Sequence, residues 1–419
     1  MEQRRCCDAA TQYRCDNPAS SGLVIPLISL ARYAALLEPR DLRQAFAVSL
    51  LGRLPIGITG LAILLLVQAT AGSFALGGLA GGSYVAGLAA LAPLLGRKID
   101  RYGPRPVLAA CAIAFPSALI ALVVAVQQAW PAAVIFAFSA AAGAVFPPIT
   151  VCMRTYLKRR FADDVLLSAA YSLESVMIEL IFIAGPMLVA LFVAFASPAT
   201  AVLFAAACGL CGSLLFLRSP ALRGWHIEQR TQRGLLGPLA EPGFALLIAV
   251  ILAYSTAFGL MEIGITAYAT ERGQPALAGV LLGLMSAGSA FGGLAYGSRS
   301  WGMPLTRQFA GALGLMGIGL AVLTLRWSPW AFTFWCVVAG IIMAPALIMQ
   351  AMLVAGTTRP EHSTEAFTWS TCALLSGVGL GLAAGGGLLE RFDSRAALGA
   401  AAVMAIGAAV GAGVALRPR

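Results

Sequence analysis

The chain has 419 residues, of which 59% are hydrophobic and only 11% are Asp, Glu, Lys or Arg. Soluble domains average about 25% charged residues, because a compact fold must cover its core with side chains that water tolerates. This deficit excludes an ordinary soluble enzyme and indicates that much of the surface faces lipid. The formal net charge is +10, so the few charges are mostly basic.

Twelve segments are apolar enough to cross a bilayer, which takes about 20 residues in a helix. They are 42–68, 74–95, 106–127, 131–153, 165–196, 198–217, 243–270, 276–297, 304–325, 329–355, 364–389 and 396–416. Their apolar runs are continuous rather than alternating, which excludes a β-barrel and leaves helices, since lipid offers the backbone no hydrogen bonds. The sequence predicts an all-α membrane protein with twelve transmembrane helices.

The basic residues predict the orientation. With the N-terminus inside the cell, 23 of the 28 Lys and Arg residues fall on cytoplasmic segments, as the positive-inside rule requires. We therefore expect a multi-pass protein of the plasma (inner) membrane with both termini cytoplasmic. The basic residues are spread over seven segments, which favours attraction to anionic lipid head groups and does not indicate nucleic-acid binding.

Polar segments divide the chain into four parts. Residues 1–41 form an N-terminal tail without the pattern of a signal peptide. Within it, Leu27–Leu37 is predicted to be an interfacial helix on the inner leaflet, with Arg32 and Arg40 toward the head groups. The longest polar break, 219–241, is a predicted cytoplasmic linker between residues 42–218 and 242–419, each with six spans.

An internal repeat supports this division. A shift of 196 residues carries Gly87 and Gly96 to Gly283 and Gly292, Ala170-Tyr171 to Ala366-Phe367, and Gly185 to Gly381, and a shift of 197 carries Gly143 to Gly340 and Pro148 to Pro345. Agreement across three pairs of spans indicates a duplication. The sequence therefore predicts two pseudo-symmetric six-helix bundles, an architecture that transporters use.

The loop between the second and third spans, Gly96-Arg-Lys-Ile-Asp-Arg-Tyr-Gly-Pro-Arg-Pro106, resembles the signature loop of the major facilitator superfamily. Together with the span number, linker and repeat, the chain is most like that family's bacterial drug and sugar exporters. The resemblance implies alternating access, with a gate that locks the two halves on the cytoplasmic side. The implied gate residues are Gly87, Gly96, Arg97, Asp100, Arg101, Gly103 and Arg105. The second-half counterpart, Gly292–Arg299, keeps the glycines but has no acid, so we expect a weaker gate there.

Four ionisable residues lie within the spans, where a charge costs roughly 2.5–3.5 kcal/mol on insertion scales and so suggests function. Arg53 and Glu174 lie at a similar depth, about 15 Å from the cytoplasmic helix ends, on spans that are neighbours in the resembled fold. They are predicted to form an ion pair, either for proton coupling or as a brace between helices. Glu179 points about 140° away from Glu174, so it is a candidate proton carrier or a packed carboxyl group. Glu262, in the outer half of span seven, is a candidate for substrate contact or coupling.

Two departures from the exporter pattern bear on proton antiport. Gly185-Pro186 only begins the family's antiporter motif, and span four lacks the Arg that many of its exporters carry, unless Arg53 takes that role. In span ten, Trp335, Met343 and Gln350 are candidates for the substrate cavity, although flexible methionines also serve plain packing.

The preferred hypothesis is a secondary transporter that exports a small molecule in exchange for protons. Uptake, by symport or facilitated diffusion, and a non-transporting membrane sensor are the alternatives. The sequence has no phosphate-binding loop for ATP, and its two histidines, His226 and His362, do not suggest a catalytic or metal site. We expect no enzyme activity, cofactor or metal. The expected partners are the substrate, protons and the bilayer, with the chain acting as a monomer.

Overall fold

The computed structural model describes residues 30–72, 74–222, 225, 237–274, 277–325, 327–359 and 362–415. The start of the predicted interfacial helix, most of the predicted linker with His226, and the last four residues lie outside the described residues. Within the described residues, twelve helical stretches have the length and hydropathy of membrane spans. The predicted all-α fold with twelve transmembrane helices is confirmed.

Nine spans are single helices and three consist of two. The single ones are α5 (Phe74–Tyr102), α6 (Pro104–Gln127), α9 (Asp164–Phe195), α10 (Pro198–Arg218), α11 (Pro242–Glu271), α12 (Leu277–Gly297), α13 (Leu305–Leu323), α16 (Ser363–Leu389) and α17 (Ser394–Ala415). The divided ones are α3 (Arg40–Arg53) with α4 (Pro55–Ala71), α7 (Ala132–Ala144) with α8 (Ile149–Arg160), and α14 (Pro329–Gly340) with α15 (Met343–Thr357).

Prolines explain where the divided spans break. Pro55 is the first residue of α4, and Pro148 immediately precedes α8. Proline fits the first turn of a helix, where its missing N–H would have no partner, but it disrupts a helix interior. The fourth span therefore continues beyond the predicted end at residue 153, through α8 to Arg160.

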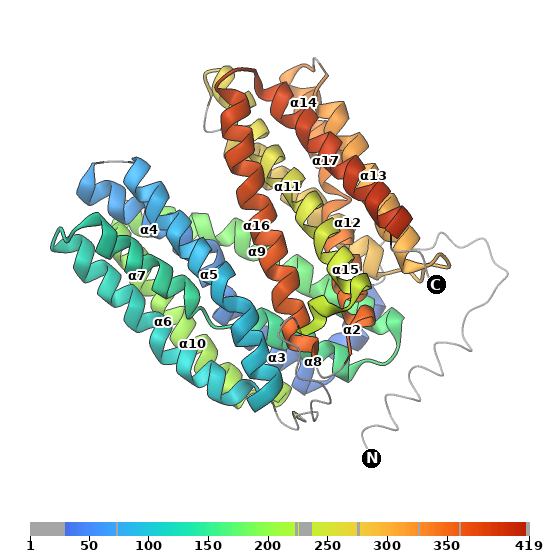
Figure 1. The fold of residues 1–419 in the computed structure, drawn as a ribbon, viewed down its shortest axis with the longest axis horizontal. Helices are drawn as coiled ribbons and strands as arrows, with labels where there is room; N and C mark the ends of the chain where they lie inside the picture. The colour runs from blue at the N-terminus through green and yellow to red at the C-terminus, as the bar shows by residue number, and fades with distance from the viewer. Residues whose placement is uncertain are drawn as a thin grey trace.

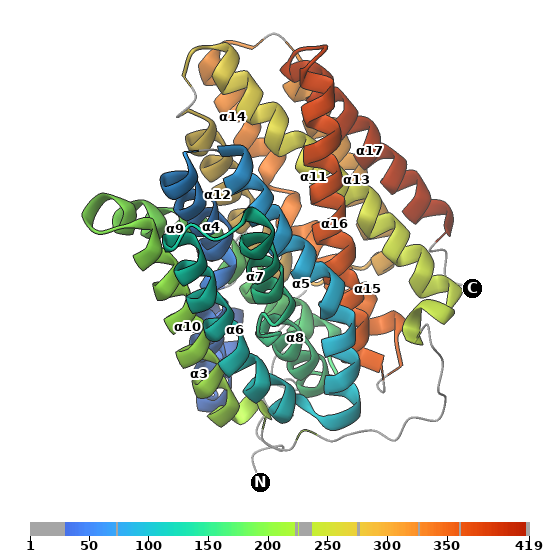
Figure 2. The same ribbon diagram turned by 60° about the vertical axis from the view of Figure 1, so that its left-hand side comes forward.

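The helices form two bundles, α3–α10 and α11–α17, which meet at one end and diverge toward the other (Figures 1 and 2). The meeting end holds the C-terminus of α5 and the N-terminus of α16, together with α2 (Leu30–Leu37) and α8. Most of the described Lys and Arg residues lie at this end, which we call the basic end. Large apolar side chains are exposed around the bundles, for example Ile113 at 67% and Val403 at 69%, as expected of a lipid-facing surface.

Close glycine contacts show how the halves correspond and correct the predicted register. A Cβ added at certain glycines would meet a backbone carbonyl of the neighbouring helix: Gly87 that of Ala140, Gly143 that of Tyr84, Gly288 that of Val337, and Gly340 that of Met285. The structural counterpart of Gly87 is therefore Gly288, at an offset of 201, whereas a Cβ at Gly283 would meet nothing. The predicted match of Gly87 to Gly283 is wrong. The helix contains several glycines that look alike in sequence, and only the approach of a neighbouring helix shows which one lies at the contact.

The same register relates two close glycine contacts between the halves. Gly96 of α5 packs against Thr368 of α16, and Gly297 of α12 packs against Ser172 of α9. Gly96 and Gly297 are 201 residues apart, whereas Ser172 and Thr368 differ by the predicted 196. The interface between the bundles is thus pseudo-symmetric, with the predicted offset correct for α9 and α16 and wrong for α5 and α12.

The short helix α2 differs from the prediction in the direction of Arg32. Arg32 donates to the carbonyl of Gly297 at 3.1 Å instead of pointing to lipid head groups. Tyr33 is 7% exposed, donates to the carbonyl of Leu294 at 2.8 Å and hydrogen-bonds Ser172 at 2.9 Å. The helix therefore packs where α9 and α12 meet at the basic end.

Candidate functional site

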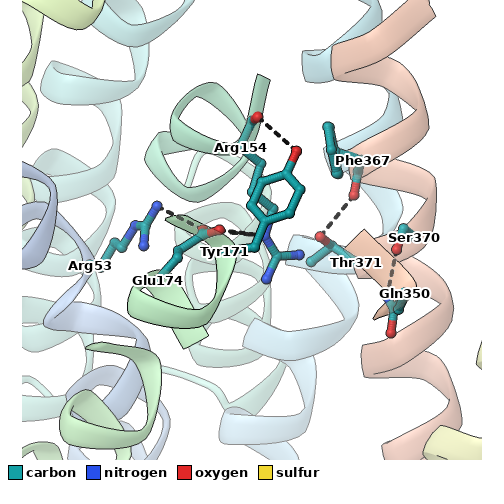
Figure 3. Close-up of polar contacts among 8 residues, drawn as sticks. All are labelled: Arg53, Arg154, Tyr171, Glu174, Gln350, Phe367, Ser370 and Thr371. Atoms are coloured by element: carbon teal, nitrogen blue, oxygen red, sulfur yellow. Dashed lines mark hydrogen bonds and ion pairs between the residues drawn. The ribbon is translucent and has the colours of Figure 1, made fainter. Parts of the chain in front are cut away.

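A buried ionic triad lies in the first bundle (Figure 3). Arg53, the last residue of α3, places Nη2 3.0 Å from Oε1 of Glu174 in α9. Arg154 of α8 donates through Nε to both carboxylate oxygens of Glu174, at 3.2 and 3.1 Å. Both Arg53 and Glu174 have side chains only 1% exposed. The structure brings the two predicted partners together and adds a second arginine that the sequence did not predict.

Arg154 was not predicted as a partner of Glu174 because, from the sequence, it was assigned to a cytoplasmic basic segment. The helix α8 ends only at Arg160, so Arg154 lies about 9 Å inside the span. The Tyr171 hydroxyl donates to the Arg154 carbonyl at 3.2 Å, which ties α8 to α9 beside the triad (Figure 3). Span four therefore does supply an arginine, although in its second helix and not in the stretch 136–143 where it was sought.

The triad carries two positive charges and one negative charge in a buried place. Nε and Nη1 of Arg53 are buried and have no hydrogen-bond partner among the described residues. A buried donor without a partner typically costs about 1–3 kcal/mol, and an unbalanced buried charge costs more. The arrangement therefore carries a stability cost that a balanced and fully hydrogen-bonded pair would avoid.

The second bundle has a neutral network at the corresponding positions. The Tyr254 hydroxyl of α11 donates to Oε1 of Gln350 in α15, and Nε2 of Gln350 donates to Oγ of Ser370 in α16 at 2.6 Å. All three side chains are buried, with exposures of 0% or 1%. Ser370 lies 196 residues after Glu174, Gln350 lies 196 after Arg154, and Tyr254 lies 201 after Arg53, so the two networks occupy corresponding places in the halves. Gln350, predicted to line the cavity, is instead a buried part of this network.

Glu179 connects the two halves near the middle of the membrane. The Ser289 hydroxyl of α12 donates to Oε1 of Glu179 at 2.7 Å. The same hydroxyl accepts from the backbone N–H of Ala344, in the first turn of α15, at 3.0 Å. One hydroxyl thus links α9 to the break in the tenth span. Within the described part of the chain, no ion pair is formed by Glu179.

At the basic end, Asp100 binds the start of α16. Its two carboxylate oxygens accept from the backbone N–H groups of Thr364, at 3.0 Å, and Glu365, at 2.7 Å. A carboxylate at a helix N-terminus meets unpaired N–H groups and the positive end of the helix dipole. Asp100 of one half is therefore a cap for a helix of the other half.

Arg97 adds an ion pair to this contact. It donates through Nε and Nη2 to Oε1 of Glu365, at 3.1 and 2.7 Å, and Glu365 is fully buried. Beside it, Gly96 is close to Thr368, so a larger residue would separate α5 from α16. The ion pair across this contact therefore uses Glu365 of the second half, which no sequence motif indicated.

The other predicted gate residues lie outside the contact between the halves. Gly87 packs against α7, in its own half. Gly103 ends α5 with φ of +81°, a conformation that favours glycine. Arg101 lies over the ring of Tyr102 at 5.1 Å and, like Arg105, is exposed.

The remaining cavity candidates are dispersed. Glu262 is exposed on α11, about 30 Å from the basic end of that helix. Trp335 of α14 is partly buried against Trp327, with ring centroids 5.7 Å apart, and Met343 is buried at the start of α15. Among the described residues, no group of three or more His, Cys, Asp or Glu side chains could hold a metal ion.

Similarity to known proteins agrees with this architecture. Residues 45–344 match the family model of the Major Facilitator Superfamily. The structure resembles a bacterial homologue of the iron transporter ferroportin in its outward-facing state, with a TM-score of 0.74, 15% identity, and 88% of this chain and 98% of that one covered. It also resembles the human organic anion transporter MFSD10, with a TM-score of 0.68, 18% identity and coverage of 90% and 100%.

A third similar structure is the E. coli fucose:proton symporter FucP, with a TM-score of 0.71, 10% identity and coverage of 90% and 98%. No curated protein sequence matches the chain. Identities this low establish the fold alone, but the family model covers most of the chain. The chain is a multi-pass membrane protein that belongs to the major facilitator superfamily.

Proposed function

We propose that the chain is a secondary transporter that exports a small molecule across the plasma membrane in exchange for protons, by alternating access. The observation that carries the proposal is the location of the contacts between the halves. The Asp100 cap and the Arg97–Glu365 pair hold the bundles together at the basic end, while the ribbons diverge toward the other end (Figure 1). We assign the basic end to the cytoplasm, with both termini there and the diverging end facing out.

The contacts at the basic end are suited to a gate. Asp100 accepts two hydrogen bonds and Arg97 forms one ion pair there, and hydrogen bonds to charged groups are worth only about 1.5–3 kcal/mol each. Two further bonds across the halves run from Ser172 to the Gly293 carbonyl at 2.5 Å and from Lys158 to the Thr358 carbonyl at 3.3 Å. Opening toward the cytoplasm would expose all of them to water, which replaces their hydrogen bonds. Asp100 and Arg97 would therefore act on the balance between two states and not on substrate binding.

Glu179 is the proposed proton carrier. Its carboxylate accepts the single hydroxyl hydrogen of Ser289, which at the same time accepts from Ala344. A proton on Glu179 would remove its charge and add a donor, which weakens the charge-assisted bond from Ser289 in the link between α9, α12 and α15. The charge of one side chain would thereby bias the contact between the two bundles.

The triad and Glu262 complete the proposal. The partnerless N–H groups of Arg53 and the shared carboxylate of Glu174 would exchange partners as α8 moves against α9. Glu262, exposed in the outer half of α11, would contact substrate on its way out.

Flux measured in proteoliposomes tests the proposal. Ethidium and a series of labelled sugars serve as probes, with and without an imposed pH gradient. We expect flux of at least one probe to depend on the gradient, and Glu179→Gln to remove that dependence while flux down the probe's own gradient remains. Gradient-dependent flux that is the same in Glu179→Gln would exclude Glu179 from coupling, and flux that follows the proton gradient in the same direction would indicate uptake instead of export.

A further inference from the structure

An apolar groove opens among α12, α13 and the break between α14 and α15. Its volume is about 310 Å³, at the small end of the range of ligand sites. Gly311, Ala312, Leu315, Ile341, Ile342 and Pro345 line its deeper part. Leu315 lies ten residues into α13, so the groove reaches about 15 Å from the basic end into the membrane.

The mouth of the groove is basic and aromatic. Arg299, Trp301 and Arg307 line it at the basic end. Both arginines are exposed, and neither forms an ion pair within the described part of the chain. Tryptophan and arginine at the end of apolar membrane helices are typical of the head-group level of a bilayer.

The loop that carries these residues is held by specific contacts. The Trp301 ring stacks on Tyr296 with centroids 5.4 Å apart, and its Nε1 donates to the Tyr296 carbonyl at 3.2 Å. Gln308 accepts from the Tyr296 hydroxyl at 2.8 Å and donates to the Met303 carbonyl at 2.6 Å. The two arginines thus lie on either side of an ordered turn at the mouth of the groove.

A second cavity of about 500 Å³ adjoins this mouth and shares Tyr296, Arg299 and Trp301. It is lined by α8 and α9 from the first bundle and α15 from the second, with Lys158 and Asp164 as its other charged residues. Arg299 therefore lies between the apolar groove and a second cavity that spans the two halves.

We propose that this groove binds an anionic phospholipid of the leaflet at the basic end, with one acyl chain along Gly311 and Leu315 and the phosphate at Arg299 and Arg307. An apolar channel at membrane depth fits a hydrocarbon chain, and the positive charge at its mouth selects an anionic head group over a zwitterionic one. The inference concerns binding alone, so it stands or fails independently of the transport activity proposed above.

Gly311 offers a direct test because a Cβ there would meet no protein atom within 4 Å. Gly311→Leu would extend a side chain into the groove from a position where its Cβ meets no protein atom. Gly407 of α17 is the matched control, since a Cβ there also meets nothing and the position lies outside the groove. Arg299→Gln combined with Arg307→Gln removes the charge and leaves the groove open.

The experiment titrates the full-length protein in detergent with phosphatidylglycerol, phosphatidylcholine of the same chains, or glycerol 3-phosphate, and records bound lipid by native mass spectrometry. For the unchanged protein we expect phosphatidylglycerol to bind about tenfold more tightly than phosphatidylcholine, and glycerol 3-phosphate to show no binding. The double arginine variant should lose this preference, and Gly311→Leu should weaken both lipids while Gly407→Leu does not. Equal binding of the two lipids by the unchanged protein, or equal effects of the two leucine variants, would overturn the proposal.

Discussion

The two halves place buried polar networks at corresponding positions but build them from different chemistry. The first half uses Arg53, Glu174 and Arg154, and the second uses Tyr254, Ser370 and Gln350. A buried neutral hydrogen bond contributes a modest free energy to stability. Buried charges lower stability unless each charge is paired with an opposite one. The comparison suggests that the first half responds to charge and the second half serves as a stable frame.

The largest expected effect comes from Glu174→Gln. The change leaves the buried Arg53 and the partly exposed Arg154 without a counter-charge, and breaking a buried pair typically costs about 3–5 kcal/mol. We expect a strong fall in the thermal unfolding midpoint in detergent. The matched change in the second half, Ser370→Ala, leaves the buried amide of Gln350 without its acceptor and should cost less, about 1–3 kcal/mol. Equal losses from the two changes would remove the distinction between the halves.

Charge reversal tests whether the network is a pair or a triad. In a simple pair, Arg53→Glu combined with Glu174→Arg would restore the stability that either change removes. Because Arg154 also binds Glu174, the double variant places two arginines together and should stay unstable. Adding Arg154→Glu should recover much of the loss, as measured by unfolding midpoints. Full rescue by the double variant would show that Arg154 is not a working partner.

An intermediate effect is expected for Asp100→Asn at the basic end. Asparagine keeps one carbonyl acceptor but loses the second and the charge that favours a helix N-terminus, a loss of about 1.5–3 kcal/mol. The state open to the cytoplasm should become more populated. Spin labels at Lys98 and Thr358 would report this as a longer distance distribution, and Arg105→Gln, an exposed change away from the contact, serves as the control.

The smallest effect is expected for Tyr254→Phe in the neutral network. The ring keeps its edge-to-face packing on Phe258 and Phe309, with centroids 5.4 and 5.9 Å apart. Only the hydroxyl bond to Gln350 is lost, so stability should fall by about 1 kcal/mol. Gradient-dependent flux should be unchanged. A loss of gradient dependence in this variant would mean that the neutral network of the second half takes part in coupling.

The sequence predicted the buried charges better than it predicted their partners. Arg53 and Glu174 were found because an ionisable residue in an apolar span is conspicuous, and a common depth made them a plausible pair. Arg154 was missed because it lies near basic residues that follow the positive-inside rule. Glu365 was missed because it begins a helix 265 residues after Asp100, and no local pattern marks that contact.

By itself, the sequence determined the number of spans, the fold class and the positions of the costly charges. It could do so because insertion into lipid depends on the composition of each segment, which is a local property. Only the tertiary structure decided the register of the repeat, the third member of the triad and the partner of the gate loop. Those features depend on which helix surfaces come within contact distance of each other. In a chain rich in glycine and alanine many positions share the same local pattern, and only helix packing determines which of them makes the contact.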